Sequence, residues 1–247
     1  MQLIRVNGED IAMNQGIIVQ ARMNSTRLPG KSLRPVHGKP MLSYLLERMK
    51  TCKRVSAIVV ATSELASDDP IANYCAMNGF ECFRGPLDDV ALRFKKALEF
   101  YGFDAFIRVN GDSPLLDPIL VDQAVSVFYS GNYDVVTNIL HRSFPKGQSV
   151  EVMGSALYCG CYQYMCDEFQ REHVTRYFYD NADRFRIHNL ISEGAFGDMQ
   201  LSVDTLADMN HFEQLVTAMN RPHLEYGYLD LIDLSRKIRA KQCGEVS

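Results

Sequence analysis

The stretch GIIVQARMNSTRLPGK, residues 16–31, joins a short apolar run to a basic segment that ends in a turn. The apolar run predicts a buried strand at 17–20, because a short apolar segment bounded by turn residues is typical of a sheet interior. The residues that follow predict a loop, since proline and glycine stand together at 29 and 30. That loop carries three cations: Arg22, Arg27 and Lys31.

Length and composition bound the class of protein. At 247 residues the chain is near the upper limit of one hydrophobic core, which favours a single domain with an elaboration. A hydrophobic fraction of 47% and a charged fraction of 23% are those of an ordinary globular protein. The net charge of −4 argues against nucleic acid or a membrane surface as a partner, because both demand a basic face.

The amino-terminal region contains no targeting signal. Residues 1–15 have no apolar stretch behind a basic one, and no later segment approaches the ~20 apolar residues that span a bilayer. We therefore expect a cytoplasmic protein without membrane insertion. Residues 1–15 are a possible extension of the domain, and the sequence leaves both Met1 and Met13 open as its start.

Seven cysteines at irregular spacings, in a chain without a secretory signal, favour reduced thiols over disulfides. Cys159, Cys161 and Cys166 form the one cluster. Such a cluster could ligate zinc, but no fourth ligand is suitably spaced. Buried or partly buried thiols are the simpler interpretation.

Strand-like and helix-like segments alternate through the first 140 residues. Strands are expected at 17–20, 56–61, 81–83, 105–109 and 133–138, and helices at 40–52, 70–78, 89–101 and after Pro118. This order is typical of a parallel sheet covered by helices. We therefore predict an α/β fold of the Rossmann-like kind, with a mostly parallel sheet.

The pattern changes after residue 140. Residues 141–198 mix loops, extended stretches and short helical pieces, and predict an inserted, partly β arm. An extended stretch at 199–204 follows, and two helices, at 206–219 and 228–241, complete the chain. No repeat or low-complexity linker is visible, so residues 16–247 should form one domain with the arm packed on its core.

The loop after the first strand holds the position that often binds a ligand in an open parallel sheet. Three cations and free backbone amides suit a triphosphate. The dinucleotide pattern G-x-G-x-x-G is absent, and the P-loop pattern is missed by one residue, because Ser25 replaces its first glycine. A P-loop enzyme remains a minor alternative. The simplest alternative is a solvated surface loop that binds no ligand. The three cations together favour phosphate binding.

The segments IIVQARMNSTRLPGKSL, GKPMLSYLLERMK, IVVATS, FRGPLDDVALRF, RVNGDSPLLDP, REHVTRYFYDN and LSVDTLAD together cover most of residues 16–210. This combination resembles the cytidylyltransferases that activate sugar acids: the CMP-sialic acid and CMP-Kdo synthetases and, most closely, the spore-coat polysaccharide type. The resemblance implies a nucleotide-diphospho-sugar transferase fold whose arm often builds a homodimer. It also implies transfer of CMP from CTP to a sugar acid, with release of pyrophosphate, for surface polysaccharide or glycoconjugate synthesis.

The resemblance assigns roles to motif residues. Arg22, Arg27 and Lys31 would contact the triphosphate with Asn24 close by, while Asp112 and Asp204 would hold Mg²⁺. The residues themselves support the metal site, because both aspartates follow predicted strands and Mg²⁺ takes carboxylate, phosphate and water oxygens. Alone, either aspartate could be a turn or helix-cap residue. We assign no covalent nucleophile and count Arg22, Arg27, Lys31 and Asp112 as catalytic.

The remaining candidates are polar residues at strand ends or in the arm. For the base and ribose these are Ala21, Thr62, Ser63, Arg84 and Asn110. For the acceptor they are Arg142, Lys146, Glu151, His173 and Thr175, with Glu172 able to bind hydroxyls or pair with a cation. Such residues also satisfy loop backbone or cap helices. The alternative function is a nucleotidyltransferase of the same fold that uses a phosphonate or other acid, a sugar 1-phosphate, or another nucleotide.

Overall fold

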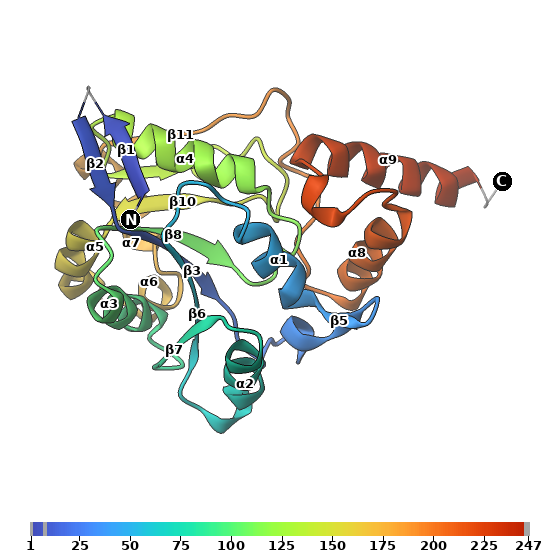
Figure 1. Cartoon of the computed structure of the whole chain (residues 1–247), viewed down its shortest axis with the longest axis horizontal. Helices are drawn as coiled ribbons and strands as arrows, with labels where there is room; N and C mark the ends of the chain where they lie inside the picture. Colours follow the sequence, from blue (N-terminus) through green and yellow to red (C-terminus); the bar gives the residue numbers. More distant parts are fainter. Residues whose placement is uncertain (1, 7–8, 245–247) are drawn as a thin grey trace.

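The computed structural model describes residues 2–6 and 9–244, and a seven-stranded sheet forms its centre (Figure 1). The strands are β3 (Gln15–Gln20), β6 (Ala57–Ser63), β7 (Glu81–Gly85), β8 (Ala105–Asn110), β9 (Val135–Thr137), β10 (Glu151–Gly154) and β11 (Ile187–Asn189). They are ordered β11-β9-β10-β8-β3-β6-β7. Within this sheet only β10 is antiparallel to its neighbours, which confirms a mostly parallel α/β fold.

The helices are α1 (Met41–Met49), α2 (Asp69–Met77), α3 (Val90–Tyr101), α4 (Pro118–Ser130), α5 (Ser155–Cys161), α6 (Glu168–Glu172), α7 (Arg176–Asp180), α8 (Leu206–Ala218) and α9 (Tyr228–Gly244). Short 3-10 helices lie at Lys31–Leu33, Ala66–Asp68, Tyr162–Tyr164, Ala182–Arg184 and His223–Glu225. Local sequence explains several ends. Asp89 and Asp117 cap α3 and α4 by accepting backbone N–H groups, and Gly102 ends α3 with a φ of 65°.

Alternating side chains of the central strands divide the core between the two faces of the sheet. Ile17 and Val19 of β3 pack with residues of α1, α2 and α4, whereas Ile18 packs with α3, α5 and α7. Successive side chains of a strand point to opposite faces, so a continuous apolar run serves both layers. The run at 16–19 therefore fixes β3 as an interior strand, as the sequence predicts.

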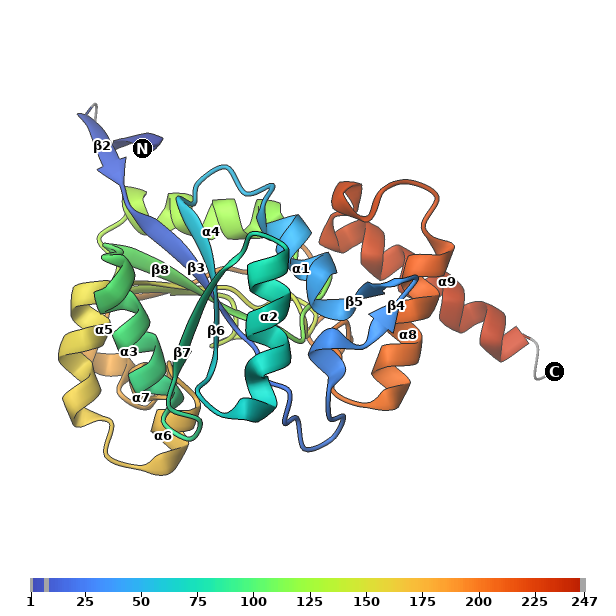
Figure 2. The ribbon, with the colours of Figure 1, turned by 60° about the horizontal axis from the view of Figure 1, so that its bottom comes forward.

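The carboxyl-terminal helices form a third apolar cluster at one end of the molecule. Met41 and Tyr44 of α1 pack with Phe212 of α8 and Leu231 of α9. Figures 1 and 2 show α8 and α9 beside α1, at the end opposite the amino terminus. This cluster attaches α8 to the sheet and so fixes the residues that precede that helix.

The structure corrects the sequence interpretation in two places. Residues 141–198 supply β10 and β11 to the main sheet, with α5 to α7 packed beside α3, so their β part belongs to the core sheet. The stretch 199–204 forms no strand and makes one isolated bridge, between Gln200 and Lys146. The local sequence of neither segment indicates which residues it pairs with, because the pairing residues are distant in the sequence.

Two small hairpins complete the described elements. β1 (Gln2–Val6) and β2 (Glu9–Met13) pair with one another outside the main sheet. β4 (Pro35–Val36) and β5 (Lys39–Pro40) form a second pair next to α1. In the possible extension at 1–15, residues 1, 7 and 8 lie outside the described part of the chain.

Candidate active site

Hydrogen bonds within the loop after β3 close it into a turn, and a further hydrogen bond joins it to Asp68, beyond the end of β6, at the carboxyl edge of the sheet. The Gly30 N–H donates to the Met23 carbonyl at 2.8 Å, and Gly30 has a φ of 74°, which favours glycine. The Met23 N–H donates to Asp68 Oδ1 at 2.7 Å, and the Ser63 N–H donates to Asp68 Oδ2 at 3.0 Å. Burial raises the pKa of Asp68, but these hydrogen bonds outweigh burial and the net pKa is lowered.

Lys31, at the end of this loop, lies between the two aspartates that the sequence nominates for a metal. Its Nζ is 3.3 Å from Asp112 Oδ2 and 3.1 Å from Asp204 Oδ1, and it donates to the Val203 carbonyl at 2.6 Å. Arg27 Nη2 lies 2.9 Å from the same Asp204 oxygen. Burial raises the pKa of Asp112, the charge of Asp204 adds to that rise, and Lys31 opposes it. The cluster is therefore a cation held by two converging carboxylates.

Backbone contacts bring these two carboxylates together. Asp112 follows β8, and its carbonyl accepts the Val203 N–H at 2.8 Å. Asp204 directly precedes the capping box of α8, in which Thr205 and Asp208 accept each other's backbone N–H groups. The two aspartates are thus placed by the end of a strand and the start of a helix, both rigid elements.

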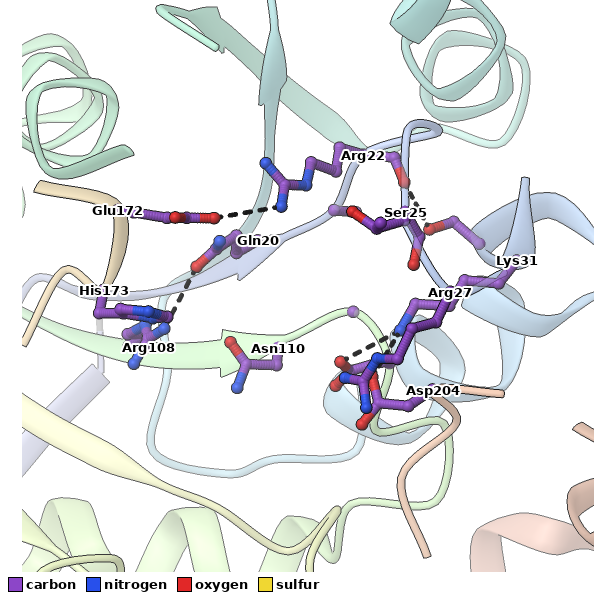
Figure 3. Close-up of a pocket in the computed structure, with 15 residues that line it drawn as sticks. Gln20, Arg22, Ser25, Arg27, Lys31, Arg108, Asn110, Glu172, His173 and Asp204 are labelled. Atoms are coloured by element: carbon purple, nitrogen blue, oxygen red, sulfur yellow. Dashed lines mark hydrogen bonds and ion pairs between the residues drawn. The ribbon is translucent and has the colours of Figure 1, made fainter. Parts of the chain in front are cut away.

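A cavity of about 310 Å³ opens at this edge, and Figure 3 shows its lining. Its floor and one end come from the loop after β3 and from the strand end and loop that contain Asn110, Gly111 and Asp112. A side chain at Gly111 would come within 2.9 Å of the Gln20 carbonyl, so glycine is required there. The cavity is polar and carries charges of both signs, as a polyanion with a metal requires.

The opposite end of the cavity is formed by Gln20, Arg108, Glu172 and His173 (Figure 3). Arg22 Nη2 lies 3.3 Å from Glu172 Oε1, an ion pair between the loop and α6. Arg108 Nη1 donates to Glu151 Oε2 at 2.7 Å. Each cation at this end therefore has an anionic partner.

The structure gathers most of the predicted nucleotide and metal residues around the cavity. Its lining includes Ala21, Arg22, Arg27, Lys31, Asn110, Asp112 and Asp204. Asn24 is outside this lining, and its Nδ2 donates to Ser67 Oγ at 3.1 Å. Of the predicted acceptor residues, His173 lines the cavity.

Three predicted base contacts, Thr62, Ser63 and Arg84, lie outside this lining. Thr62 and Ser63 are 0% exposed, and the Ser63 hydroxyl donates to Asp68. Arg84 donates to the Ser63 and Leu65 carbonyls and pairs with Asp69 at 2.7 Å. The Ser63 hydroxyl also accepts the Leu65 N–H, so Ser63 and Arg84 satisfy loop backbone, an ordinary role of polar residues near the end of a strand.

Four predicted acceptor residues also lie outside the lining. Arg142 donates to Ser149, and Lys146 belongs to the bridge with Gln200. Glu151 and Thr175 are buried behind Arg108, where both accept hydrogen bonds from its Nη1.

Sequence reasoning missed Gln20 and Arg108, and named Glu172 only in passing. Gln20 is the last residue of β3, and Arg108, within β8, alternates with the buried Ile107 and Val109. A charged residue inside an apolar strand of a central sheet was the available signal, since such a side chain needs a partner or a ligand.

Two further expectations concern the cysteines and the membrane. The thiols of Cys52, Cys75, Cys82, Cys159, Cys161 and Cys166 are free. Within residues 2–6 and 9–244 no group of three or more His, Cys, Asp or Glu side chains is arranged to hold a metal. No helix in the same part of the chain is long and apolar enough to cross a membrane.

A basic loop and two carboxylates at the carboxyl edge of a mostly parallel sheet define a nucleotidyltransferase. The chain belongs to the cytidylyltransferase family, whose model matches residues 16–234. It is 34% identical over 206 residues to the spore coat polysaccharide biosynthesis protein SpsF of Bacillus subtilis, covering 80% of this chain and 84% of that one. It is 33% identical over 132 residues to the 8-amino-3,8-dideoxy-manno-octulosonate cytidylyltransferase of Shewanella amazonensis, covering 51% and 52% of the two chains.

A solved cytidylyltransferase from Leptospira borgpetersenii has the same fold. Its TM-score is 0.88 at 31% sequence identity, and the match covers 93% of this chain and 96% of that one. The fold class and the enzyme class predicted from the sequence are therefore confirmed.

Proposed function

We propose that this protein is a magnesium-dependent cytidylyltransferase that transfers CMP from CTP to a sugar acid and releases pyrophosphate. One observation carries the proposal: the Lys31 ammonium faces Asp112 and Asp204 at 3.3 and 3.1 Å, inside a cavity whose loop also supplies Arg22 and Arg27. A triphosphate needs such cations for its charge, and a metal needs such carboxylates.

The two aspartates fit Mg²⁺. Their oxygens converge on one cation, the Lys31 ammonium, so they are aimed at a common point. Hard carboxylate oxygens, completed by phosphate and water, are what Mg²⁺ takes. When bound, the ion would supply Lewis-acid polarisation of a phosphate oxygen.

The protein's own side chains would bind the triphosphate and position the acceptor. Arg22, Arg27 and Lys31 would bind the triphosphate and offset the charge that develops on the departing pyrophosphate. Gly111 lets the backbone of β3 and the loop after β8 approach one another, which shapes the cavity floor. An acceptor hydroxyl held beside the α-phosphate would then attack it in line, with no covalent enzyme intermediate.

The acceptor class is supported by the relatives. The Shewanella amazonensis enzyme is named for an amino sugar acid, and the Bacillus subtilis protein for spore coat polysaccharide biosynthesis. Sugar acids of the 2-keto-3-deoxy kind, sialic acid-like or Kdo-like, are therefore the first acceptors to test.

The first experiment measures thermal shifts with CTP, UTP, ATP and GTP, each with and without Mg²⁺. A ligand at 100 times its Kd adds about 2.7 kcal/mol of stability, so a selective nucleotide is readily seen. We expect the largest, magnesium-enhanced shift with CTP. A selective shift with another nucleotide would instead identify a nucleotidyltransferase of the same fold with a different substrate.

The second experiment follows pyrophosphate release with CTP and a panel of sugar acids, phosphonates and sugar 1-phosphates. We expect release with at least one sugar acid, loss of release in Asp112→Asn, and no change in Asp198→Asn, an exposed aspartate outside the cavity. Release only with a phosphonate or a sugar 1-phosphate would replace the acceptor class. Retained turnover in Asp112→Asn would remove that residue from the site.

We further propose that the enzyme acts in the cytoplasm, where CTP is made, and as a homodimer. The family resemblance supports dimerisation through residues 141–198. Light scattering coupled to gel filtration tests the second point, since a monomeric mass would exclude the dimer.

A further inference from the structure

Arg108 stands at the end of the cavity opposite Arg27 and Lys31. On β8 it shares a face with Asn110, while Ile107 and Val109 point into the core. Figure 3 shows Arg108 beside His173 at one end, Arg27 and Lys31 at the other, and Asn110 between them. A strand advances ~3.3 Å per residue, so Arg108 lies farther back along β8 than Asn110, which is nearer to Asp112 and its partner Lys31.

A buried carboxylate fixes and neutralises this guanidinium. Nη1 donates to Glu151 Oε2 at 2.7 Å and to Thr175 Oγ1 at 3.2 Å, and Glu151 is 3% exposed. The Tyr179 hydroxyl donates to Glu151 Oε1 at 2.5 Å. Burial raises the pKa of Tyr179 far above its ordinary value, so the phenol keeps its proton and remains a donor. Arg108 is therefore held in one orientation from behind.

The N–H groups on the other edge of the guanidinium have few hydrogen-bond partners among the described residues. Nη2 makes one long hydrogen bond, 3.3 Å to Gln20 Oε1, and the buried Nε has no hydrogen-bond partner among the described residues. The Nε–H and Nη2–H groups of an arginine lie parallel in one plane and match the two oxygens of a carboxylate. Gln20 lines the same cavity, so its amide oxygen occupies a place that a ligand oxygen could take.

We propose that Arg108 binds the carboxylate of the acceptor acid, which displaces the Gln20 amide oxygen from this edge. The inference rests on the proposed function, because it assigns the acid group of that acceptor. The other cations of the cavity have other work: Arg27 and Lys31 face the metal carboxylates, and Arg22 is paired with Glu172. The Nε–H and Nη2–H groups of Arg108 can each donate to one oxygen of a carboxylate, whereas an ester offers one strong acceptor oxygen and a methylated one, so Arg108 favours the acid over its ester.

The test compares acceptor kinetics in matched variants. Arg108→Gln alone leaves the buried Glu151 carboxylate without its ion-pair partner and can unfold the protein. The variant Arg108→Gln/Glu151→Gln removes both charges together and keeps the site neutral. Arg186→Gln, which removes an exposed arginine paired with Asp134 outside the cavity, is the control.

The probes are the panel acid that the wild-type protein uses in pyrophosphate release and its C1 methyl ester. Charge-assisted hydrogen bonds contribute about 1.5–3 kcal/mol, so we expect the acceptor KM of the double variant to rise about 10- to 100-fold. Its KM for CTP should stay within about twofold of the wild-type value, because the two substitutions remove no contact to the nucleotide. The wild-type preference for acid over ester should disappear in the double variant and persist in the control.

Each other outcome is decisive. An unchanged acceptor KM, or an equal rise in the KM for CTP, overturns the role of Arg108 and leaves the proposed function standing. A preference for acid over ester that survives in the double variant also overturns it. If the wild-type protein releases pyrophosphate with no acid of the panel, the proposed function fails, and this inference fails with it.

Discussion

Arg22 Nη2 lies 3.3 Å from Oε1 of Glu172, and this ion pair joins the loop after β3 to α6 across the cavity. The Arg22 and Glu172 side chains are 34% and 48% exposed, so water screens the pair and its contribution to stability is small. The ion pair has a larger effect on nucleotide binding, because the Glu172 carboxylate competes with an incoming triphosphate for the Arg22 cation.

Replacement of Glu172 by Gln should therefore tighten CTP binding. The change frees Arg22 and removes one negative charge from the cavity lining. An exposed ion pair contributes up to about 1 kcal/mol, so the Kd for CTP should fall up to about fivefold, as measured by calorimetry. Glu168→Gln, on the same helix but outside that lining, should leave the Kd unchanged. Weaker CTP binding in Glu172→Gln would mean that this carboxylate itself holds the nucleotide.

Lys31→Gln should reduce turnover strongly. The variant leaves Asp112 and Asp204 facing one another without the ammonium between them and removes a charge from the triphosphate end. Loss of one preorganised group that stabilises developing charge costs about 100- to 1,000-fold in rate, so kcat for pyrophosphate release should fall by that factor. Lys39→Gln, in a partly exposed pair with Glu47 outside the cavity lining, is the matched control. A fall of less than about threefold would place Lys31 outside the catalytic machinery.

The central strands and their loops could be predicted because their signals are local. Continuous apolar runs mark interior strands of a parallel sheet, and the carboxyl ends of such strands meet at one edge. That rule is enough to bring Lys31 and Asp112 together from the sequence. The same rule also nominates Asp204, after a predicted extended stretch, but that stretch forms no strand and Asp204 is instead held by the start of α8.

The far end of the cavity could not be predicted, because it depends on pairing between distant segments. Glu151 stands opposite Arg108 only because β10 lies antiparallel to β8 in this register. The sequence therefore predicts Glu151 and Thr175 as acceptor-binding residues, whereas in the structure both accept hydrogen bonds from Arg108. Thr62 and Ser63 are the last two residues of β6 and are buried, and Ser63 donates to Asp68.

Asp68→Asn should destabilise the protein and disorder the phosphate loop. An amide cannot accept from Met23 and Ser63 at once, since one of its two positions becomes a donor that faces the Ser63 N–H. Loss of hydrogen bonds to a buried charge costs about 2–3 kcal/mol in the free energy of unfolding, measurable by urea denaturation. Asp69→Asn, the exposed neighbour paired with Arg84, should change it little.

The same residue predicts part of the acid sensitivity. The pKa of Asp68 is lower in the folded protein than its ordinary value, so the folded state favours the carboxylate. Its contribution to stability is then complete above about pH 4 and is lost as the pH falls through the folded pKa. Asp68→Asn should flatten the unfolding free energy below pH 4, and an unchanged slope in that range would contradict the assignment.

His223 predicts a second pH dependence, at higher pH. Burial, together with the charge of Lys39, lowers the pKa of His223 from 6.5 to about 4, although Glu47 lies 3.1 Å from its Nε2. The folded state therefore favours the neutral imidazole. Stability from this residue is complete above pH 6.5 and is lost progressively as the pH falls toward 4.

Urea unfolding at a series of pH values tests this expectation. Between pH 6.5 and pH 4 the wild-type protein should lose about 2–3 kcal/mol of unfolding free energy through His223, because each pKa unit corresponds to about 1.4 kcal/mol. His223→Gln should show a smaller loss over that range, while His141→Gln, at an exposed position, should follow the wild-type curve. Since His223 lies against Tyr44 of α1 in the cluster that attaches α8, protonation of its ring would also loosen the support of Asp204. The magnesium-dependent part of the CTP thermal shift should therefore weaken as the pH falls from 6.5, and should weaken less in His223→Gln.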